Sequence, residues 1–476
     1  MIQATPPKTS PLRPSSRRGL EYPAEQVAAA RHDRPVVIVH GTLVDKESIT
    51  AYRDYALKTG HPVDLRTYKS VQDGGRIEDS ARQVAGHVNQ ARQELAQTHL
   101  DELKGASPLE LQGFFQVDSS PRGQIVTAEL PWLLEQVSAA VASTDNLSYQ
   151  LQQVEQRLAQ RLGGQEWADK AAAQMVDCLA PKATLVGHSA GGFVAYAVAV
   201  NPRSPGSSPD LSYDGGLGVG QVVVLSSPIG KGMSFPAPPG LAEMPFYNLD
   251  SKVLRPLEST PPMQLASLNP FFAFNYALSK SATKMAYTVG TQLATAMAVP
   301  LIYAMKPGYE EVSGFSNFFK ECIQGKPVPE GVTVVAVTSP DDKMALTDRS
   351  QVDDSQPNAH NFEADLQLSA AELKRERPTW GHVQMSTKPV QFLQQFDQKL
   401  LDDPRQAQRF LDPANDDGSR YHVLQVIERR CQADEDFLTS QPLLQQSLQQ
   451  VADEGQPFLD SPSALAQRIL DSTAKN

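Results

Sequence analysis

Four short runs of apolar, mostly β-branched residues lie along the chain, and each ends at a turn that contains glycine or serine. They cover residues 36–39, 183–186, 221–225 and 332–337. Runs of this length that are apolar at nearly every position are typical of strands buried on both faces of a parallel sheet. The chain is therefore expected to contain at least four central strands of one sheet.

Helical patterns lie between these predicted strands. One of them is an apolar stripe with spacings of 3, 4 and 4 residues, formed by Leu151, Val154, Leu158 and Leu162. Such a stripe is typical of a helix lying on a sheet. The alternation of strands and helices predicts an α/β fold with a doubly wound, mostly parallel sheet. Ligands of such sheets bind beyond the carboxyl ends of the strands, so the residues directly after each strand are the candidates for a functional site.

The chain divides into three parts by composition. Residues 1–22 are rich in Pro, Ser, Thr and Arg and lack an apolar period, which predicts a disordered leader. Residues 23–400 are expected to form the main α/β domain, with residues 255–325 inserted into it as an apolar helical cap or lid. Residues 401–476 contain 13 acids, 7 bases and 11 glutamines, and apolar residues at helical spacing, so they are expected to add an acidic helical tail to the core.

The insertion has very few charges. Between Glu258 and Lys306 the only charged residues are Lys280 and Lys284. The uncharged stretch is long enough to cross a bilayer, but its Thr, Gly, Gln and Pro residues make a weak membrane span. Helices packed over the sheet are the favoured interpretation, and a membrane crossing or a surface that docks on a membrane are the alternatives.

Overall composition excludes several classes of protein. The 476 residues are 40% hydrophobic and 20% charged, which is typical of a globular chain with a large core. A net charge of -11 gives no footprint for nucleic acid. Three widely spaced cysteines indicate neither a disulfide framework nor a zinc site. The N-terminus lacks the apolar run of a signal peptide, so a cytoplasmic protein is expected, and export by a route without such a signal is left open.

The strongest local motif is GHSAGG at residues 187–192. It follows the predicted strand 183–186 and precedes an apolar stretch that reads as a buried helix. In a strand-to-helix turn this tight the central residue has strained dihedral angles, and the flanking glycines avoid collisions. Ser189 would then project from the turn, where a base can deprotonate its hydroxyl. A chance GxSxG sequence in a loop is the alternative.

A serine nucleophile also needs backbone N–H groups that hold the oxyanion of a tetrahedral intermediate. The turn His40-Gly41-Thr42 directly follows the first predicted strand. The amides of Thr42 and Ala190 could therefore converge on one point as an oxyanion hole. The alternative is that His40-Gly41 is only a turn.

Three segments together resemble the α/β-hydrolase superfamily, and within it the bacterial lipases and esterases. They are VVIVHGT from residue 36, LVGHSAGG from residue 185 and VVVLSSPIGKG from residue 222. The resemblance extends over about residues 34–400 and implies an α/β-hydrolase sheet. It is specific for the superfamily and does not indicate a substrate.

The order of catalytic residues in this superfamily is serine, acid, histidine, which leaves His360, His382 and His422 as candidates for the base. The resemblance favours His382, because Gly381-His382-Val383 precedes an amphipathic helix, similar to the closing loop and last helix of the family. His360 is expected in a polar loop with nothing to fix its ring, and His422 belongs to the added tail.

The acid is expected directly after the predicted strand 332–337. The resemblance favours Asp342, which is followed after one polar residue by an apolar pair. Asp341 is the alternative acid, and Asp250 is a more remote one. An Asp-Asp turn in solvent, without a catalytic role, is the simplest competing interpretation.

These residues imply a serine carboxylic-ester hydrolase of the lipase or phospholipase type that works through an acyl-enzyme on Ser189. No metal or organic cofactor is required. The substrate is expected to be an ester or lipid, and the insertion either lines an acyl-chain pocket, contacts a membrane surface or only buries its own apolar residues. A thioesterase or acyltransferase with the same residues, and a non-catalytic interaction protein on a hydrolase scaffold, are the competing functions. The sequence does not indicate an oligomeric state.

Overall fold

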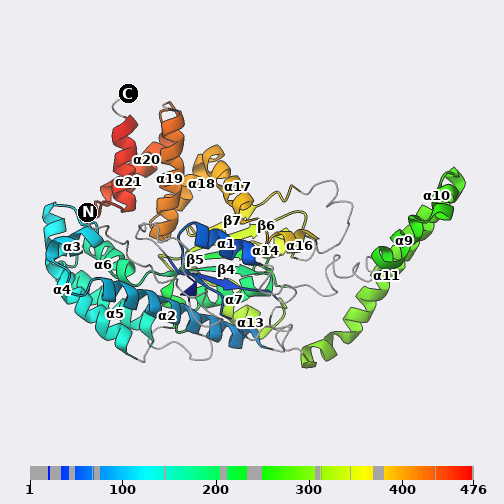
Figure 1. The fold of residues 1–476 in the computed structure, drawn as a ribbon, viewed down its shortest axis with the longest axis horizontal. Helices are drawn as coiled ribbons and strands as arrows, with labels where there is room; N and C mark the ends of the chain where they lie inside the picture. The colour runs from blue at the N-terminus through cyan, green and yellow to red at the C-terminus, as the bar shows by residue number, and fades with distance from the viewer. Residues whose placement is uncertain are drawn as a thin grey trace, which may run out of the picture.

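One twisted sheet forms the centre of the computed structural model, with helices on both faces (Figure 1). The structure describes residues 20–21, 34–41, 49–66, 68, 75–143, 146–203, 212–232, 249–305, 311, 313–342, 345–367, 380–434 and 436–473. The strands are β1 (Leu20–Glu21), β2 (Val36–Val39), β3 (Val63–Asp64), β4 (Ala183–His188), β5 (Val219–Leu225), β6 (Thr333–Thr338) and β7 (Ala359–Glu363).

The strand order is β1-β3-β2-β4-β5-β6-β7. Strands β2 to β7 are parallel, whereas β1, at one edge of the sheet, pairs antiparallel with β3. This confirms the predicted α/β fold with a mostly parallel sheet. Every residue of β2 and β6 is buried, which explains why both strands read as uninterrupted apolar runs.

Residues 1–22 were predicted to form a disordered leader, and this is wrong for residues 20 and 21. Leu20 and Glu21 form β1, and the Leu20 side chain is buried. The Leu20 amide also donates to a carboxylate oxygen of Glu94 at 3.1 Å. A neighbouring strand edge and a place in the core order these two residues despite the polar composition around them.

The first face of the sheet is covered by α2 (Ile77–Glu102), α7 (Ala190–Val200) and α13 (Asn317–Cys322). Helix α7 follows β4 directly and is buried at every position from Gly191 to Val200. Between β3 and β4, four further helices extend this layer. They are α3 (Pro108–Phe114), α4 (Pro121–Ala142), α5 (Leu147–Arg161) and α6 (Glu166–Leu179), and they share an apolar core with part of α2.

The second face is covered by α1 (Thr50–Lys58), α17 (Pro389–Asp402) and the helices of the C-terminal region. The C-terminal helices are α18 (Pro404–Leu411), α19 (Asp417–Ala433), α20 (Pro442–Asp453) and α21 (Pro462–Thr473). Leu424 and Leu448 belong to the same buried cluster as the sheet residues Ile38 and Val186. The described residues from 401 to 473 thus form mainly helices, and their apolar side complements one face of the sheet.

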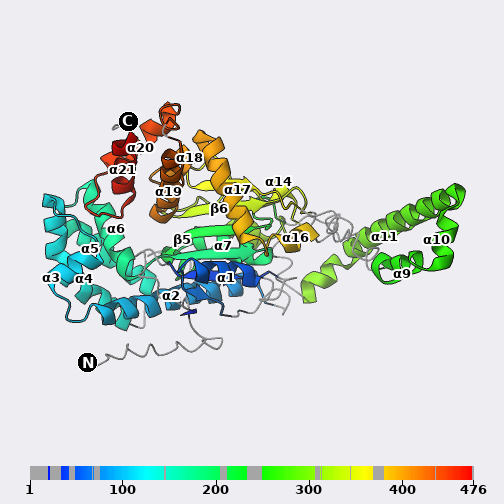
Figure 2. The same cartoon turned by 45° about the horizontal axis from the view of Figure 1, so that its top comes forward.

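Helices also form within the insertion, but only its last part, with α13, packs on the sheet. A π-helix at Asp250–Leu254 leads into α9 (Arg255–Glu258), α10 (Pro261–Ser267) and α11 (Pro270–Met305). Figures 1 and 2 show these helices as an arm that projects away from the sheet, where a cap packed over it was expected. Among the described residues, no helix is both long enough and apolar enough to span a bilayer.

Two short helices near the carboxyl edge of the sheet complete the fold. Helix α14 (Thr347–Ser350) follows β6, and α16 (Trp380–Gln384) precedes α17. Helix α14 packs on β6, and Gly381 in α16 lies against the backbone of Asp341, shortly after β6. The loops at this edge of the sheet carry the residues that the sequence singled out.

Candidate active site

Ser189 occupies the turn between β4 and α7 in a strained backbone conformation. Its φ is 55° and its ψ is -127°, a combination that residues with a side chain rarely adopt. Strain of this kind costs about 1–3 kcal/mol and is concentrated at functional sites. The Ser189 side chain is half-buried. The predicted strand–serine–helix turn is therefore present, with the serine at its apex.

Glycines make this turn possible because other backbone segments approach it closely. A Cβ atom on Gly187 would lie 2.5 Å from the carbonyl oxygen of Gly191. One on Gly191 would lie 2.1 Å from the carbonyl oxygen of Val39, at the end of β2. The N-terminus of α7 thus lies directly against the residues that follow β2.

The His40-Gly41 turn adjoins Ser189. A Cβ atom on Gly41 would lie 2.7 Å from the Cβ atom of Ser189. Of the two amides predicted to hold an oxyanion, Ala190 is the first residue of α7, where backbone N–H groups have no partner within the helix. Thr42 lies outside the described residues, so its amide stays a prediction.

Tyr68 holds the turn after β2. Its hydroxyl donates a hydrogen bond to the carbonyl oxygen of His40, and its ring stacks on the His40 ring with the centroids 4.6 Å apart. Burial raises the pKa of Tyr68 well above its ordinary value, so the hydroxyl stays protonated and remains a donor. The sequence did not single out Tyr68, since no motif marks it.

Asp342 and His382 form a buried pair. The Nδ1–H group of His382 donates to Oδ2 of Asp342 at 2.8 Å, and the two side chains are 3% and 0% exposed. The Ala345 amide donates to the other carboxylate oxygen at 3.0 Å. Burial by itself would raise the pKa of Asp342, but the interactions with His382, Ser226 and Ala345 outweigh it and lower that pKa. Asp342 therefore carries a negative charge that orients the imidazole.

The two other acids considered from the sequence have different surroundings. Asp341 is exposed, while Asp342 next to it is buried. Asp250 begins the arm, where Arg255 and Lys280 contact its carboxylate at 2.8 Å and 2.6 Å. The acid that the structure pairs with His382 is Asp342.

His382 is tied to the strand that carries Ser189. The Nε2–H group of His188 donates to the carbonyl oxygen of His382 at 2.8 Å, and the two imidazole centroids are 4.7 Å apart. The Nε2 atom of His382 is buried and has no hydrogen-bond partner in the part of the chain that is described. A histidine whose Nδ1 is held by a carboxylate and whose Nε2 carries a lone pair is arranged to accept a proton.

His188 is a site residue that sequence reasoning missed, although it lies within the GHSAGG motif. Burial, and then the neighbouring His382, lower its pKa to about 3. It is neutral at physiological pH, and because its Nε2 donates, the proton resides on Nε2. It therefore fixes the His382 backbone without adding a positive charge beside the imidazole.

The remaining candidate histidines lie elsewhere. His360 was expected in a polar loop with a free ring, and this is wrong. It lies in β7, its Nε2 is 2.8 Å from the side-chain oxygen of Asn415, and its ring stacks on Phe410. His422 lies on α19 with its Nε2 2.8 Å from Asp397. Both histidines have structural partners.

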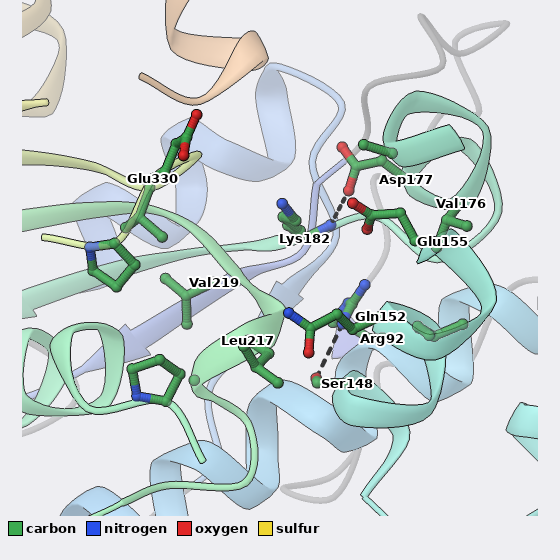
Figure 3. Close-up of a pocket in the computed structure, with 16 residues that line it drawn as sticks. Arg92, Ser148, Gln152, Glu155, Val176, Asp177, Lys182, Leu217, Val219 and Glu330 are labelled. Carbon is green, nitrogen blue, oxygen red and sulfur yellow. Dashed lines mark hydrogen bonds between the residues drawn. The ribbon is translucent and has the colours of Figure 1, made fainter. Parts of the chain in front are cut away.

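A cavity of about 170 Å³ lies at the opposite edge of the sheet. Its lining includes Lys182 before β4, Val219 at the start of β5 and Val332 before β6, so it opens at the amino ends of the strands. Figure 3 shows Arg92 directed to Ser148 and the Asp177 carboxylate directed to the Lys182 amide. This cavity is separate from the Ser189 region.

No cluster of His, Cys, Asp and Glu suited to a metal ion occurs among the residues that the structure describes. All three cysteines are buried, and no disulfide joins them. A comparison with protein-family models gives no match, and no curated protein matches the chain.

Proposed function

We propose that the protein is a serine carboxylic-ester hydrolase with Ser189 as nucleophile, His382 as base and Asp342 as the acid that orients the base. The observation that carries this proposal is the buried Asp342–His382 pair, linked through His188 to the strained serine turn. The parallel sheet and the strand–serine–helix turn support an α/β-hydrolase fold as the scaffold.

The chemistry proceeds in two halves. His382 Nε2 removes the proton of the Ser189 hydroxyl as its oxygen attacks the ester carbonyl, and then gives that proton to the leaving alcohol. Water next attacks the acyl-enzyme, with His382 again as base. The negative charge of Asp342 stabilises the imidazolium formed in each half. In this structure Nε2 has no hydrogen-bond partner among the described residues, and such bonds often tighten only when substrate is bound.

The oxyanion of each tetrahedral intermediate would be held at the N-terminus of α7. The Ala190 amide is one donor, and the partial positive charge of the helix terminus favours the developing negative charge. Thr42 is the proposed second donor, because the close contact of Gly41 with Ser189 brings the turn after β2 to the serine. Loss of one such donor costs about 3 kcal/mol of transition-state stabilisation.

The proposed substrates are esters of fatty acids, including phospholipids. A thioesterase or acyltransferase would form the same acyl-enzyme, from a thioester in the first case and with an alcohol in place of water in the second. Parallel assays with an ester and with an acyl-CoA of the same chain length separate these activities. The lipase or phospholipase assignment requires faster turnover of the ester.

The test combines a covalent probe with a rate measurement. A fluorophosphonate should label the wild-type chain and Ser279→Ala, an exposed serine of α11 used as a matched control, and should not label Ser189→Ala. Hydrolysis of a medium-chain p-nitrophenyl ester should follow the same pattern. Equal hydrolysis by wild type and Ser189→Ala overturns the proposal. A chain that neither reacts with the probe nor hydrolyses esters favours the non-catalytic interaction protein.

A further inference from the structure

Helix α11 carries a row of exposed apolar side chains. Phe274, Leu278, Met285 and Val289 are 66%, 58%, 70% and 54% exposed. At about 100° of rotation per residue, their positions fall within about 60° of each other around the helix. We call these four residues the apolar stripe. Large exposed apolar side chains gathered in one row mark an interaction surface.

The arm's own helices cover the other side of α11. Tyr276 donates to a Glu258 carboxylate oxygen at 3.1 Å, and Lys280 contacts the carboxylates of Glu258 and Asp250 at 2.9 Å and 2.6 Å. Tyr276 and Lys280 point roughly opposite to the apolar stripe on the helical wheel. Helices α9 and α10 therefore leave the stripe exposed, on an arm that extends away from the sheet (Figure 2).

Charge indicates what kind of surface the stripe would meet. Residues 250–305 contain four basic residues (Lys252, Arg255, Lys280 and Lys284) and two acidic ones (Asp250 and Glu258), a net charge of +2, although the whole chain has a net charge of -11. A basic segment with an exposed apolar row is complementary to a surface that is both apolar and anionic. Lipid bilayers that contain anionic headgroups have this combination.

A second copy of the arm fits the stripe less well. In one heptad register Leu278 and Met285 alternate with Ser281 and Thr288, and in the other they alternate with Ala282 and Val289, so packing alone would permit a seam. Charge decides against it, because two arms of the same net positive charge repel each other, whereas anionic headgroups attract both.

We propose that the apolar stripe docks α11 on the surface of an anionic lipid bilayer, with the helix lying in the plane of the interface. Phe274, Leu278, Met285 and Val289 would enter the boundary between headgroups and acyl chains. Because no described helix is long and apolar enough to cross a bilayer, the arm would rest on the membrane. This proposal is independent of the ester hydrolysis proposed above, since docking requires no reaction at Ser189.

Flotation of the full-length chain with vesicles tests the proposal. The chain carries Ser189→Ala so that vesicles stay intact, and the vesicles contain either phosphatidylcholine alone or phosphatidylcholine with phosphatidylglycerol. Replacing Phe274 and Met285 by Ser should weaken binding to the anionic vesicles roughly 100-fold, about tenfold for each side chain. The matched control replaces Leu109 and Leu459, which are 77% and 60% exposed outside the arm, by Ser and should bind like the parent.

Circular dichroism checks that both double variants are folded. This is the expected result because the replaced side chains are exposed. The proposal is supported if the stripe variant no longer binds the anionic vesicles while the control variant and the parent still do. Failure of the parent chain to float with anionic vesicles overturns it, and so does equal flotation with both kinds of vesicle. Sedimentation tests for a second copy of the arm. A dimer that the stripe substitutions dissociate and that vesicles do not affect overturns the proposal in favour of that second copy. None of these readouts depends on esterase activity.

Discussion

Asp342→Asn separates the proposed role of this side chain in catalysis from its role in folding. Asparagine keeps an oxygen that can accept from the Ala345 amide, so the stability loss should be about 1 kcal/mol. Its NH2 group, however, would face Nδ1 of His382, which now donates at 2.8 Å. The imidazole would have to accept there and carry its proton on Nε2, so it could no longer accept the proton of Ser189.

The size of the effect follows from this change of tautomer. With the geometry retained and the wrong tautomer present, kcat should fall about 10⁴-fold, which corresponds to about 5.5 kcal/mol of transition-state stabilisation. KM should change little, because the Asp342 side chain is fully buried and would not touch a bound substrate. The measurement is steady-state hydrolysis of a medium-chain p-nitrophenyl ester near neutral pH.

Asp341→Asn is the matched control, because Asp341 precedes Asp342 in the same turn and is exposed. Its kcat should stay within about twofold of wild type, since an exposed carboxylate that does not contact His382 adds little to the field at the imidazole. More than a tenth of the wild-type kcat in Asp342→Asn, or a larger loss in Asp341→Asn, would refute the proposed role of Asp342.

Three further predictions concern stability, measured by urea unfolding. Gly191→Ala should prevent folding, because its Cβ would lie 2.1 Å from the Val39 carbonyl oxygen, whereas Gly86→Ala, with no atom within 4 Å, should stabilise α2 by about 1 kcal/mol. Arg34→Met should cost about 3–5 kcal/mol, because it leaves two largely buried carboxylates without their cation, and a loss below 1 kcal/mol would contradict this. Burial lowers the pKa of His360 to about 4, so the unfolded chain binds more protons and stability should fall as pH decreases from 6.5 to 4. His360→Gln should make that slope shallower by up to about 1.4 kcal/mol per pH unit, and an unchanged slope would argue against the lowered pKa.

The sequence predicted the central strands well because strands buried on both faces consist almost entirely of apolar residues. The runs at 36–39, 183–186, 221–225 and 332–337 correspond to β2, β4, β5 and β6, whose side chains pack on both faces of the sheet. Strand β7 does not form such an apolar run, since it contains His360 and Asn361. His360 is accommodated by Asn415, and Asn361 by the backbone of Val352. Polar partners distant in sequence cannot be read from an apolar pattern.

The residues of the candidate site also differ in whether the sequence could predict them. Ser189 was predicted from local geometry, because a strand, a glycine-flanked serine and a helix follow one another in the sequence. The choice of Asp342 and His382 depended on a resemblance, and the structure brings these two residues into contact. The part played by His188 could not be predicted, since it requires contact with a carbonyl group 194 residues away. Local motifs therefore locate the proposed nucleophile, and only the fold identifies the groups that position the proposed base.

The boundary drawn at residue 400 shows how composition can suggest a division that the core does not have. The acidic, Gln-rich segment after it resembles an appendage, yet Arg34 at the start of β2 binds both Asp416 before α19 and Asp177 in α6. Asp416 also accepts a hydrogen bond from the Ser419 amide and so caps α19. One buried arginine thus connects the central sheet, the helical layer between β3 and β4, and the C-terminal helices. The polar residues of this segment form its solvent side, and its apolar residues complete the core that holds the strands in place beneath Ser189 and His382.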